Sequence, residues 1–164
     1  MGATLLQSLF RQKAAIDDEF FDVLETLATA DRHEALRVLN HIHVVDRIFA
    51  AHLRGEPHGF EATNTPETPA LDALRAAVRE TDRWFVEHAG ALTPGQLAEA
   101  LDFSFTDGER GRMSRAEMLA HVVTHASYHR GEVGRLLKAR GVAPPRDLFT
   151  AYLHRAEPQR RVPA

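Results

Sequence analysis

The sequence predicts an all-α four-helix bundle with a long crossover connection and a short β-hairpin-like segment before the last helix. Two observations lead to this fold class. Apolar residues recur at three- and four-residue steps in four long segments, and one long segment rich in helix breakers separates the second of these from the third. The chain has 164 residues, the length of one ordinary domain, so we expect a single domain over residues 1–164.

The first two helices are expected over about residues 3–28 and from about Asp31 to Gly55. Asp31 has the side chain of an N-cap, and Gly55 fits a C-cap. The next segment, residues 56–68, reads EPHGFEATNTPET and favours a long crossing loop. A third helix is then expected to begin with Thr68 as its cap and Pro69 in its first turn.

A different pattern precedes the fourth helix. Alternating apolar and polar residues over 101–106 run into Asp107-Gly108, which indicates a strand followed by a turn. Ser114 and Glu117 then form a capping box, and the fourth helix is expected to extend from there to Gly141. Residues 141–164 are predicted to be a tail with one short helix around Phe149.

Composition excludes several classes of protein. The formal net charge is -3, whereas domains bound to nucleic acid usually carry a basic patch, so we expect no nucleic-acid partner. The absence of cysteine excludes disulfides and thiolate ligands, and any transition metal must rest on imidazole and carboxylate. No apolar run is long enough for a bilayer, and the N-terminal residues lack the pattern of a signal peptide, so a cytoplasmic location is expected.

Histidines on the second and fourth expected helices indicate a metal site. On the second helix, His41 shares the apolar face that must turn to the core, whereas His43 falls nearly opposite. On the fourth, His125 and His129 are four residues apart on the core side, and His121 lies further round. Three imidazoles can bind zinc or a similar cation and leave coordination positions open. The alternative is three separate core histidines, but an i, i+4 pair with an inward histidine on a partner helix favours the shared site.

Four segments of the sequence form a recognisable set: LNHIHVVDRIFAAHLRG (39–55), the crossing loop with NTPETP, FSFTDG before the fourth helix, and HVVTHASYHRGEVG (121–134). On these segments, the sequence resembles the DinB-like family along nearly its whole length. The resemblance implies a four-helix bundle, commonly a homodimer, that holds a nickel- or zinc-like divalent ion.

The ligand positions that match the family pattern are His41, His125 and His129. His43 is the main rival for the first place, because a shift of two residues would bring it into the pattern. The family often has Gln after the HRG motif, whereas this chain has Glu132, which could tune the metal, act as a fourth ligand or assist as a general base. Metal-bound histidines usually donate their other N–H to a carboxylate or carbonyl.

Two functions follow from these residues. The first is a metal-dependent enzyme acting on a small molecule, either a hydrolase or a transferase that uses a low-molecular-weight thiol, as some relatives do. The second is a non-catalytic dimeric bundle that binds a metal or ligand or acts in a stress response, because no second clear catalytic group is present. Two further residues are expected to be structural: Asp46 in an ion pair with Arg47 or Arg130, and Arg130 in a structural pair or as the anchor of a loop carbonyl.

Overall fold

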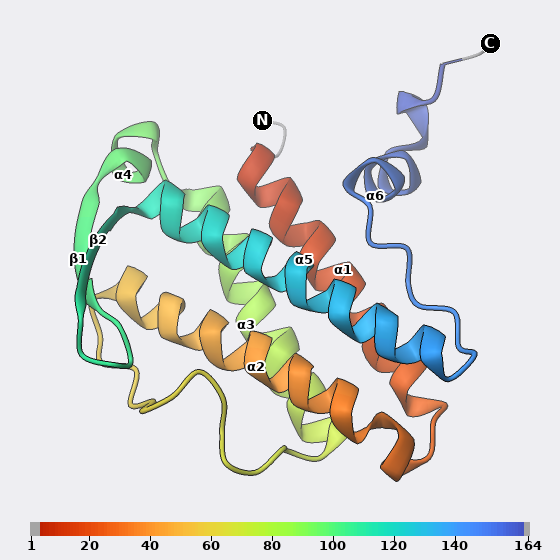
Figure 1. Cartoon of the computed structure of the whole chain (residues 1–164). Helices are drawn as coiled ribbons and strands as arrows, with labels where there is room; N and C mark the ends of the chain where they lie inside the picture. The colour runs from red at the N-terminus through yellow and green to blue at the C-terminus, as the bar shows by residue number, and fades with distance from the viewer. Residues whose placement is uncertain (1–3, 163–164) are drawn as a thin grey trace.

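The computed structural model describes residues 4–162, which form six α-helices, a two-stranded antiparallel sheet and a short 3-10 helix (Figure 1). The elements follow in the order α1 (Leu5–Glu25), α2 (Thr29–Arg54), α3 (Leu71–Ala91), α4 (Pro94–Ala98), β1 (Ala100–Ser104), β2 (Arg110–Ser114), α5 (Arg115–Ala139), α6 (Phe149–Ala156) and η1 (Pro158–Arg160). The predicted fold class is confirmed, because four long helices form the bundle and a hairpin precedes α5. No helix among the described residues is both long and apolar enough to cross a membrane.

The four long helices pack as two pairs. Helix α1 contacts mainly α3, and α2 contacts mainly α5, which Figure 1 shows side by side at the front of the bundle. The crossing loop between α2 and α3 runs along the lower edge of the molecule in this view, and the β1–β2 hairpin closes one end, with Ala100 paired to Ser114 and Ser104 paired to Arg110. The neighbouring α2 and α5 can therefore present side chains to one shared site.

Helix boundaries differ from the predictions at three starts. Helix α1 begins after the cap of Thr4 and ends at Glu25, so the expected range was too long, and residue 3 lies outside the described residues. Helix α2 begins at Thr29, and Asp31 lies in its first turn, where a negative charge favours the helix dipole without capping it. Helix α3 begins at Leu71 rather than after Thr68, because Thr68 still belongs to the crossing loop that Arg37 holds against α2.

Other boundary predictions are confirmed. Gly55 ends α2 in the left-handed region at φ 69°, and Ser114 and Glu117 form the capping box of α5. The short helix around Phe149 is α6. Helix α4 was not predicted, although Thr93 and Gln96 form a capping box around Pro94 that indicates it.

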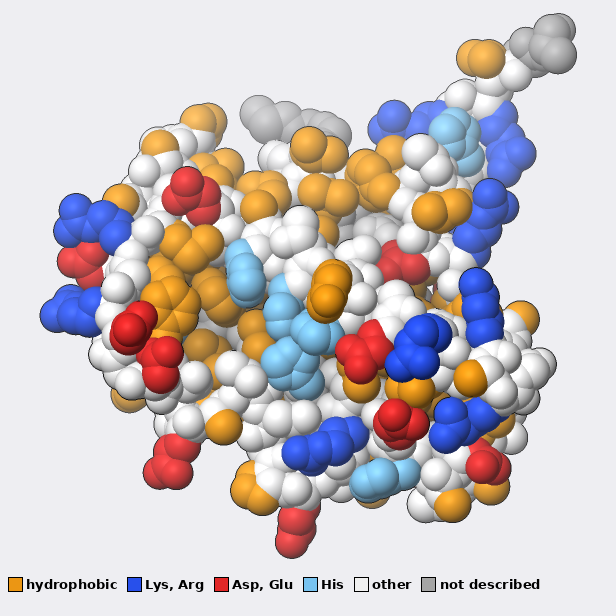
Figure 2. Space-filling model, viewed as in Figure 1, with side chains coloured by type: hydrophobic (Ala, Val, Ile, Leu, Met, Phe, Trp, Pro, Cys, Tyr) orange, Lys and Arg blue, Asp and Glu red, His pale blue; other side chains and the backbone are white. Residues whose placement is uncertain are grey.

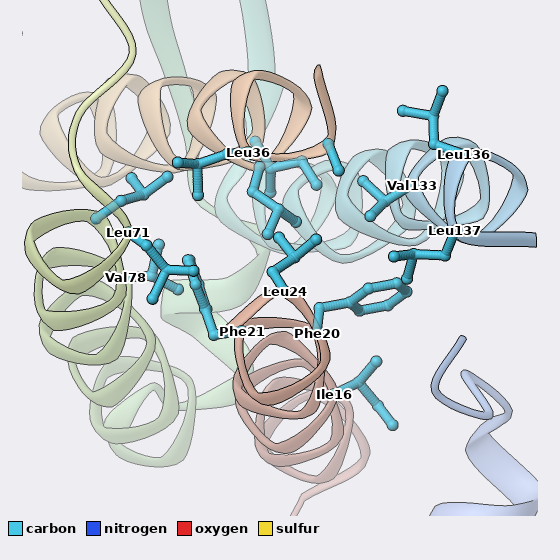
Figure 3. Packing of buried hydrophobic residues seen from close by; sticks show 14 of the residues in the cluster. Ile16, Phe20, Phe21, Leu24, Leu36, Leu71, Val78, Val133, Leu136 and Leu137 are labelled. Atoms are coloured by element: carbon cyan, nitrogen blue, oxygen red, sulfur yellow. The ribbon is translucent and has the colours of Figure 1, made fainter. Parts of the chain in front are cut away.

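The apolar core consists of two clusters of buried side chains. The first surrounds the C-terminal half of α1, where Phe20, Phe21 and Leu24 pack against α2, α3 and α5 (Figure 3). The second lies toward the hairpin and includes Phe10 and Phe85, whose rings stack with centroids 4.9 Å apart. Each fully buried side chain of this kind contributes about 1.5–3 kcal/mol to folding.

A layer of buried charges lies between Phe10 of the second cluster and Ile16 of the first. We call it the buried charge cluster, and its members are Lys13, Asp17, Asp46, Asp82, Arg130 and Asp147. The ammonium of Lys13, with no exposed side-chain surface, lies 2.7 Å from Asp17, 2.7 Å from Asp46 and 2.6 Å from Asp82. Although burial alone would lower the pKa of Lys13, these carboxylates raise it.

The same cluster corrects one prediction and confirms another. Asp46 forms an ion pair, but with Lys13 of α1 rather than with Arg47 or Arg130, because its side chain points into the bundle interior. Arg130 is structural as predicted: it pairs with Asp17 at 2.9 Å and with Asp147 at 2.8 Å, and it thereby ties α5 to α1 and to the segment before α6.

Candidate metal centre

The structure brings together the three histidines selected from the sequence. His41 lies on α2, and His125 and His129 lie one turn apart on the neighbouring α5. The Nε2 atom of His41 is 3.1 Å from Nε2 of His125 and 3.2 Å from Nε2 of His129. One nitrogen from each ring lies within 4.8 Å of the others, a grouping that could hold a metal ion. We call these three residues the histidine centre.

The outer nitrogens of two of these rings have defined partners. Nδ1 of His41 lies 2.7 Å from the carbonyl oxygen of Thr63, and Nδ1 of His129 lies 3.2 Å from a carboxylate oxygen of Glu132. Both partners are acceptors, so each Nδ1 must carry the proton and donate it. The Nε2 atoms of His41 and His129 therefore have their lone pairs directed inward.

When both rings are neutral, these tautomers leave two lone pairs facing each other at 3.2 Å without a proton between them, and the lone pairs repel. Burial lowers the pKa of His41, so its ring stays neutral rather than becoming a second donor. For comparison, two nitrogens at the zinc–imidazole distance of about 2.0–2.1 Å in tetrahedral geometry are about 3.3 Å apart. The two printed separations from Nε2 of His41, 3.1 and 3.2 Å, are therefore compatible with nitrogens that share one ion.

His125 completes the centre with a ring that is also neutral. Burial lowers its pKa to about 3, with His41 and His129 adding to the effect. Its Nδ1 is buried and has no hydrogen-bond partner within the described residues. Because the ring is uncharged at neutral pH, one of its two nitrogens carries a lone pair, and the ring need not release a proton to solvent before it acts as a ligand.

The centre opens to the surface of the bundle. Figure 2 shows histidine side chains gathered in the middle of this face, over α2 and α5, with a hydrophobic area beside them. Each of the three ligand candidates is partly exposed. Tyr128, 77% exposed, stands edge-on to the ring of His129 with centroids 5.0 Å apart. A small molecule can therefore reach the inner nitrogens.

Comparison with known proteins places this geometry in a family. The sequence profile of the DinB family matches residues 1–161. The chain belongs to the DinB family. The crystal structure of a DinB-like protein from Bacillus cereus is similar to it in fold, with a TM-score of 0.61 and 19% sequence identity over 84% of this chain and 94% of that one. No curated protein matches the sequence.

The other histidines considered as ligands of this DinB-family chain lie elsewhere. His43 was predicted to face away from the core, which is wrong: it is 6% exposed, because α2 also packs against α1 and α3 on the side opposite α5. It lies near Asp46 and Trp84 rather than in the histidine centre. His121 stacks on the rings of His125 and Phe49 and contributes no nitrogen to the centre.

Glu132 has a defined place in the structure. It lies against Nδ1 of His129, on the far side of the ring from the inner nitrogens. This position is that of an orienting partner, which fixes the tautomer and raises the basicity of the ligand nitrogen. A role as fourth ligand does not fit this arrangement, because its carboxylate is turned away from the centre.

The sequence analysis missed the carbonyl of Thr63 and the residue that positions it. Asn40, buried beside His41 on α2, donates to the side chains of Asn64 and Thr65, each at 2.6 Å. These bonds fix the crossing loop against α2, so that the neighbouring Thr63 presents its carbonyl to His41. An asparagine within an otherwise apolar helical face was the available signal, because a buried amide requires partners.

Proposed function

We propose that the histidine centre of this DinB-family chain holds a divalent metal ion, zinc or nickel, and that the chain is a metal-dependent enzyme acting on a small molecule. The observation that carries the proposal is the pair of outer acceptors, Thr63 and Glu132, which direct two inner lone pairs at each other. A donor set of three imidazoles suits both metals.

The residues of the chain have separate parts in this proposal. His41, His125 and His129 would bind the ion, and three protein ligands leave a position for a further molecule. The Thr63 carbonyl and the Glu132 carboxylate hold the Nδ1 protons and keep the rings in place. A divalent ion supplies Lewis acidity, which lowers the pKa of a water or thiol bound to it.

Two reaction classes fit this arrangement: hydrolysis, and transfer from a low-molecular-weight thiol to an electrophile. The chain contains no cysteine, so a thiol nucleophile would come from a second small molecule. Glu132 is engaged by His129, which favours the orienting role over that of a general base. A homodimer is part of the same proposal, and sedimentation velocity tests it.

Metal content tests the first half of the proposal. We expect the protein purified after zinc or nickel loading to contain one ion per chain, measured by elemental analysis. His41→Ala, His125→Ala and His129→Ala should each lose it. His43→Ala and His121→Ala are the matched controls and should keep it, since neither side chain reaches the centre. Stoichiometric metal in His125→Ala protein would refute the site.

Turnover tests the second half. The metal-loaded protein is assayed against small esters and electrophiles, with and without added thiols, and His125→Ala protein serves as the control. We expect one class of substrate to turn over only with the intact centre. Background rates in every condition, from protein that retains its metal, would support the alternative of a non-catalytic metal-binding bundle.

A further inference from the structure

A second concave site lies between α2 and α3, on the side of α2 turned away from α5. It is a cavity of about 370 Å³, within the size range of small-molecule sites. Three residues of α2 and three of α3 provide its polar and aromatic lining: His43, Arg47, Arg54, Glu80, Thr81 and Trp84. None of them belongs to the histidine centre or supports it.

The charges around this cavity favour an anion. Arg47 forms no ion pair among the described residues, and its guanidinium lies over the ring of Phe60, 5.0 Å from the centroid. Arg54 pairs with Glu56, a carboxylate that is itself mostly exposed to water. Glu80 is the one carboxylate of the lining, and it forms no ion pair with Arg47, so the guanidinium of Arg47 is left without a paired carboxylate among the described residues. Guanidinium groups bind carboxylates and phosphates through paired hydrogen bonds.

The buried side of the cavity adds little charge of its own. Burial, together with Arg47 and Lys13, lowers the pKa of His43 to about 4, so its ring is neutral at pH 7. The hydroxyl of Thr81 already donates to the carbonyl of Ala77 at 3.1 Å. The positive charge of the two arginines at the rim is therefore not offset by ionised groups of the lining other than Glu80.

Trp84 gives the cavity a flat apolar wall. Its ring is half-buried, stacks on His88 with centroids 4.5 Å apart, and has the guanidinium of Arg54 4.9 Å from its centroid. The contact with His88 on one side holds the indole in a fixed orientation. Because His88 stacks on the indole and the guanidinium of Arg54 lies over it, a planar ring in the cavity could pack against the indole edge and the guanidinium plane while an attached anionic group reaches Arg47.

We infer that this cavity, which we call the α2–α3 pocket, binds a small organic anion: a carboxylate or phosphate attached to a planar ring. The acid group is bound by Arg47 and Arg54, and the ring packs on Trp84. The α2–α3 pocket is a separate site, so occupancy there does not depend on a metal at the histidine centre.

The position of Trp84 provides a direct test, because it is the only tryptophan of the chain. Its emission is followed while benzoate, phenyl phosphate or neutral benzyl alcohol is added, with N-acetyltryptophanamide as the correction for quenching in solution. We expect saturable changes with one or both anions and none with the alcohol. The two anions distinguish a carboxylate site from a phosphate site. The same curves are expected from metal-free His125→Ala protein.

Three variants, each of which removes one charge, test which residues bind the anion. Arg47→Gln should weaken binding at least about tenfold, which is the effect of losing a charge-assisted hydrogen bond. Glu80→Gln should tighten binding by about threefold, because it removes the opposing charge. Arg83→Gln is the control, since Arg83 is an exposed neighbour of Trp84 outside the lining, and it should change affinity by less than about twofold. Circular dichroism checks that each variant is folded.

Several outcomes would overturn the inference. One is the absence of saturable change with either anion, and another is an equal response to benzyl alcohol. A third is an equal loss of anion affinity in Arg47→Gln and Arg83→Gln, which would show that the anion responds to the overall positive charge and not to Arg47 in particular. The last is a change in Trp84 emission that follows protein concentration in step with dimer formation in sedimentation velocity, which would assign this face to a second copy of the chain.

Discussion

Two polar groups interrupt the apolar interior of this bundle, and they differ in how far their members satisfy each other. In the buried charge cluster, Lys13 lies within 2.7 Å of three carboxylates, and Arg130 pairs with two. In the histidine centre, the outer nitrogens of His41 and His129 have acceptors as partners, so the inner nitrogens of these two rings turn lone pairs toward each other when both rings are neutral. Each charge of the first group lies beside an opposite charge, although Oδ1 of Asp46 has no hydrogen-bond partner within the described residues, whereas the inner nitrogens of the second group have no charged partner.

This difference separates a structural role from a functional one. Buried charges are tolerated when they are paired and hydrogen-bonded, so the buried charge cluster needs no ligand to explain it. Where two neutral imidazoles turn inner lone pairs toward each other, as the outer acceptors of His41 and His129 favour, the rings gain nothing from each other. The stability of the fold must therefore hold them in place, and a cation is the partner that makes the arrangement favourable.

Substitution of Lys13 is expected to have the largest effect on the stability of the protein. Lys13→Met leaves Asp17, Asp46 and Asp82 buried without their shared cation. We expect the free energy of unfolding to fall by about 3–5 kcal/mol, measured by denaturant titration, with or without metal. Arg79→Met, which removes a half-exposed partner of Asp18, is the control and should cost about 1 kcal/mol or less. Equal losses in the two variants would show that the buried charge cluster is not a distinct structural unit.

The stabilisation of the fold by zinc tests the histidine centre. An ion that binds only the folded chain stabilises it by about 2.7 kcal/mol when its concentration is a hundredfold above the dissociation constant. We expect this gain for the wild-type protein, in unfolding curves recorded with and without zinc, and no gain for His125→Ala. His121→Ala should keep it, because that ring lies outside the centre. The same gain in His125→Ala would mean that zinc binds elsewhere.

These two polar groups also show what the sequence could and could not predict. Helical periodicity and i, i+4 spacing were enough to select His41, His125 and His129, because both depend on residues of one helix at a time. The partner of Asp46 was missed because Lys13 comes from a helix far away in the sequence. The burial of His43 was missed because one helix can turn two faces to the core when it has neighbours on both sides.

The pH dependence of stability tests the protonation state of Asp82 in the buried charge cluster. Burial, together with the nearby Asp17 and Asp46, raises the pKa of Asp82 to about 8, although Lys13 opposes this. A carboxyl group with a raised pKa holds its proton more tightly in the folded chain. Its contribution to stability is present at low pH and is lost as the pH rises from about 4 to about 8.

Asp82→Asn removes this titration while its amide oxygen can still accept from Lys13. We therefore expect wild-type stability, relative to the variant, to decrease by an amount on the order of 1–2 kcal/mol between pH 5 and pH 7. Denaturant titrations at pH 5, 6 and 7 measure the difference. A difference that stays constant or grows with pH would show that Asp82 is ionised in the folded chain throughout this range.

The smallest effect, a change in zinc affinity, is expected for substitution of Glu132. This residue adds a carboxylate to the histidine centre, as aspartates do in the buried charge cluster. Its carboxylate accepts a hydrogen bond from Nδ1 of His129, yet its side chain is 44% exposed, so water screens the interaction.

Glu132→Gln keeps an acceptor oxygen and loses the charge, and Glu132→Ala loses both. Removal of such an orienting partner typically weakens metal binding by about 10–100-fold. We expect Glu132→Ala to reach about tenfold and Glu132→Gln to remain below it, in competition titrations with a zinc chelator, while Glu87→Gln, an exposed carboxylate on α3, changes nothing. If Glu132→Gln and Glu132→Ala weaken zinc equally, the charge rather than the position of the proton matters, and the inner lone pair of His129 would have to be fixed by the metal itself.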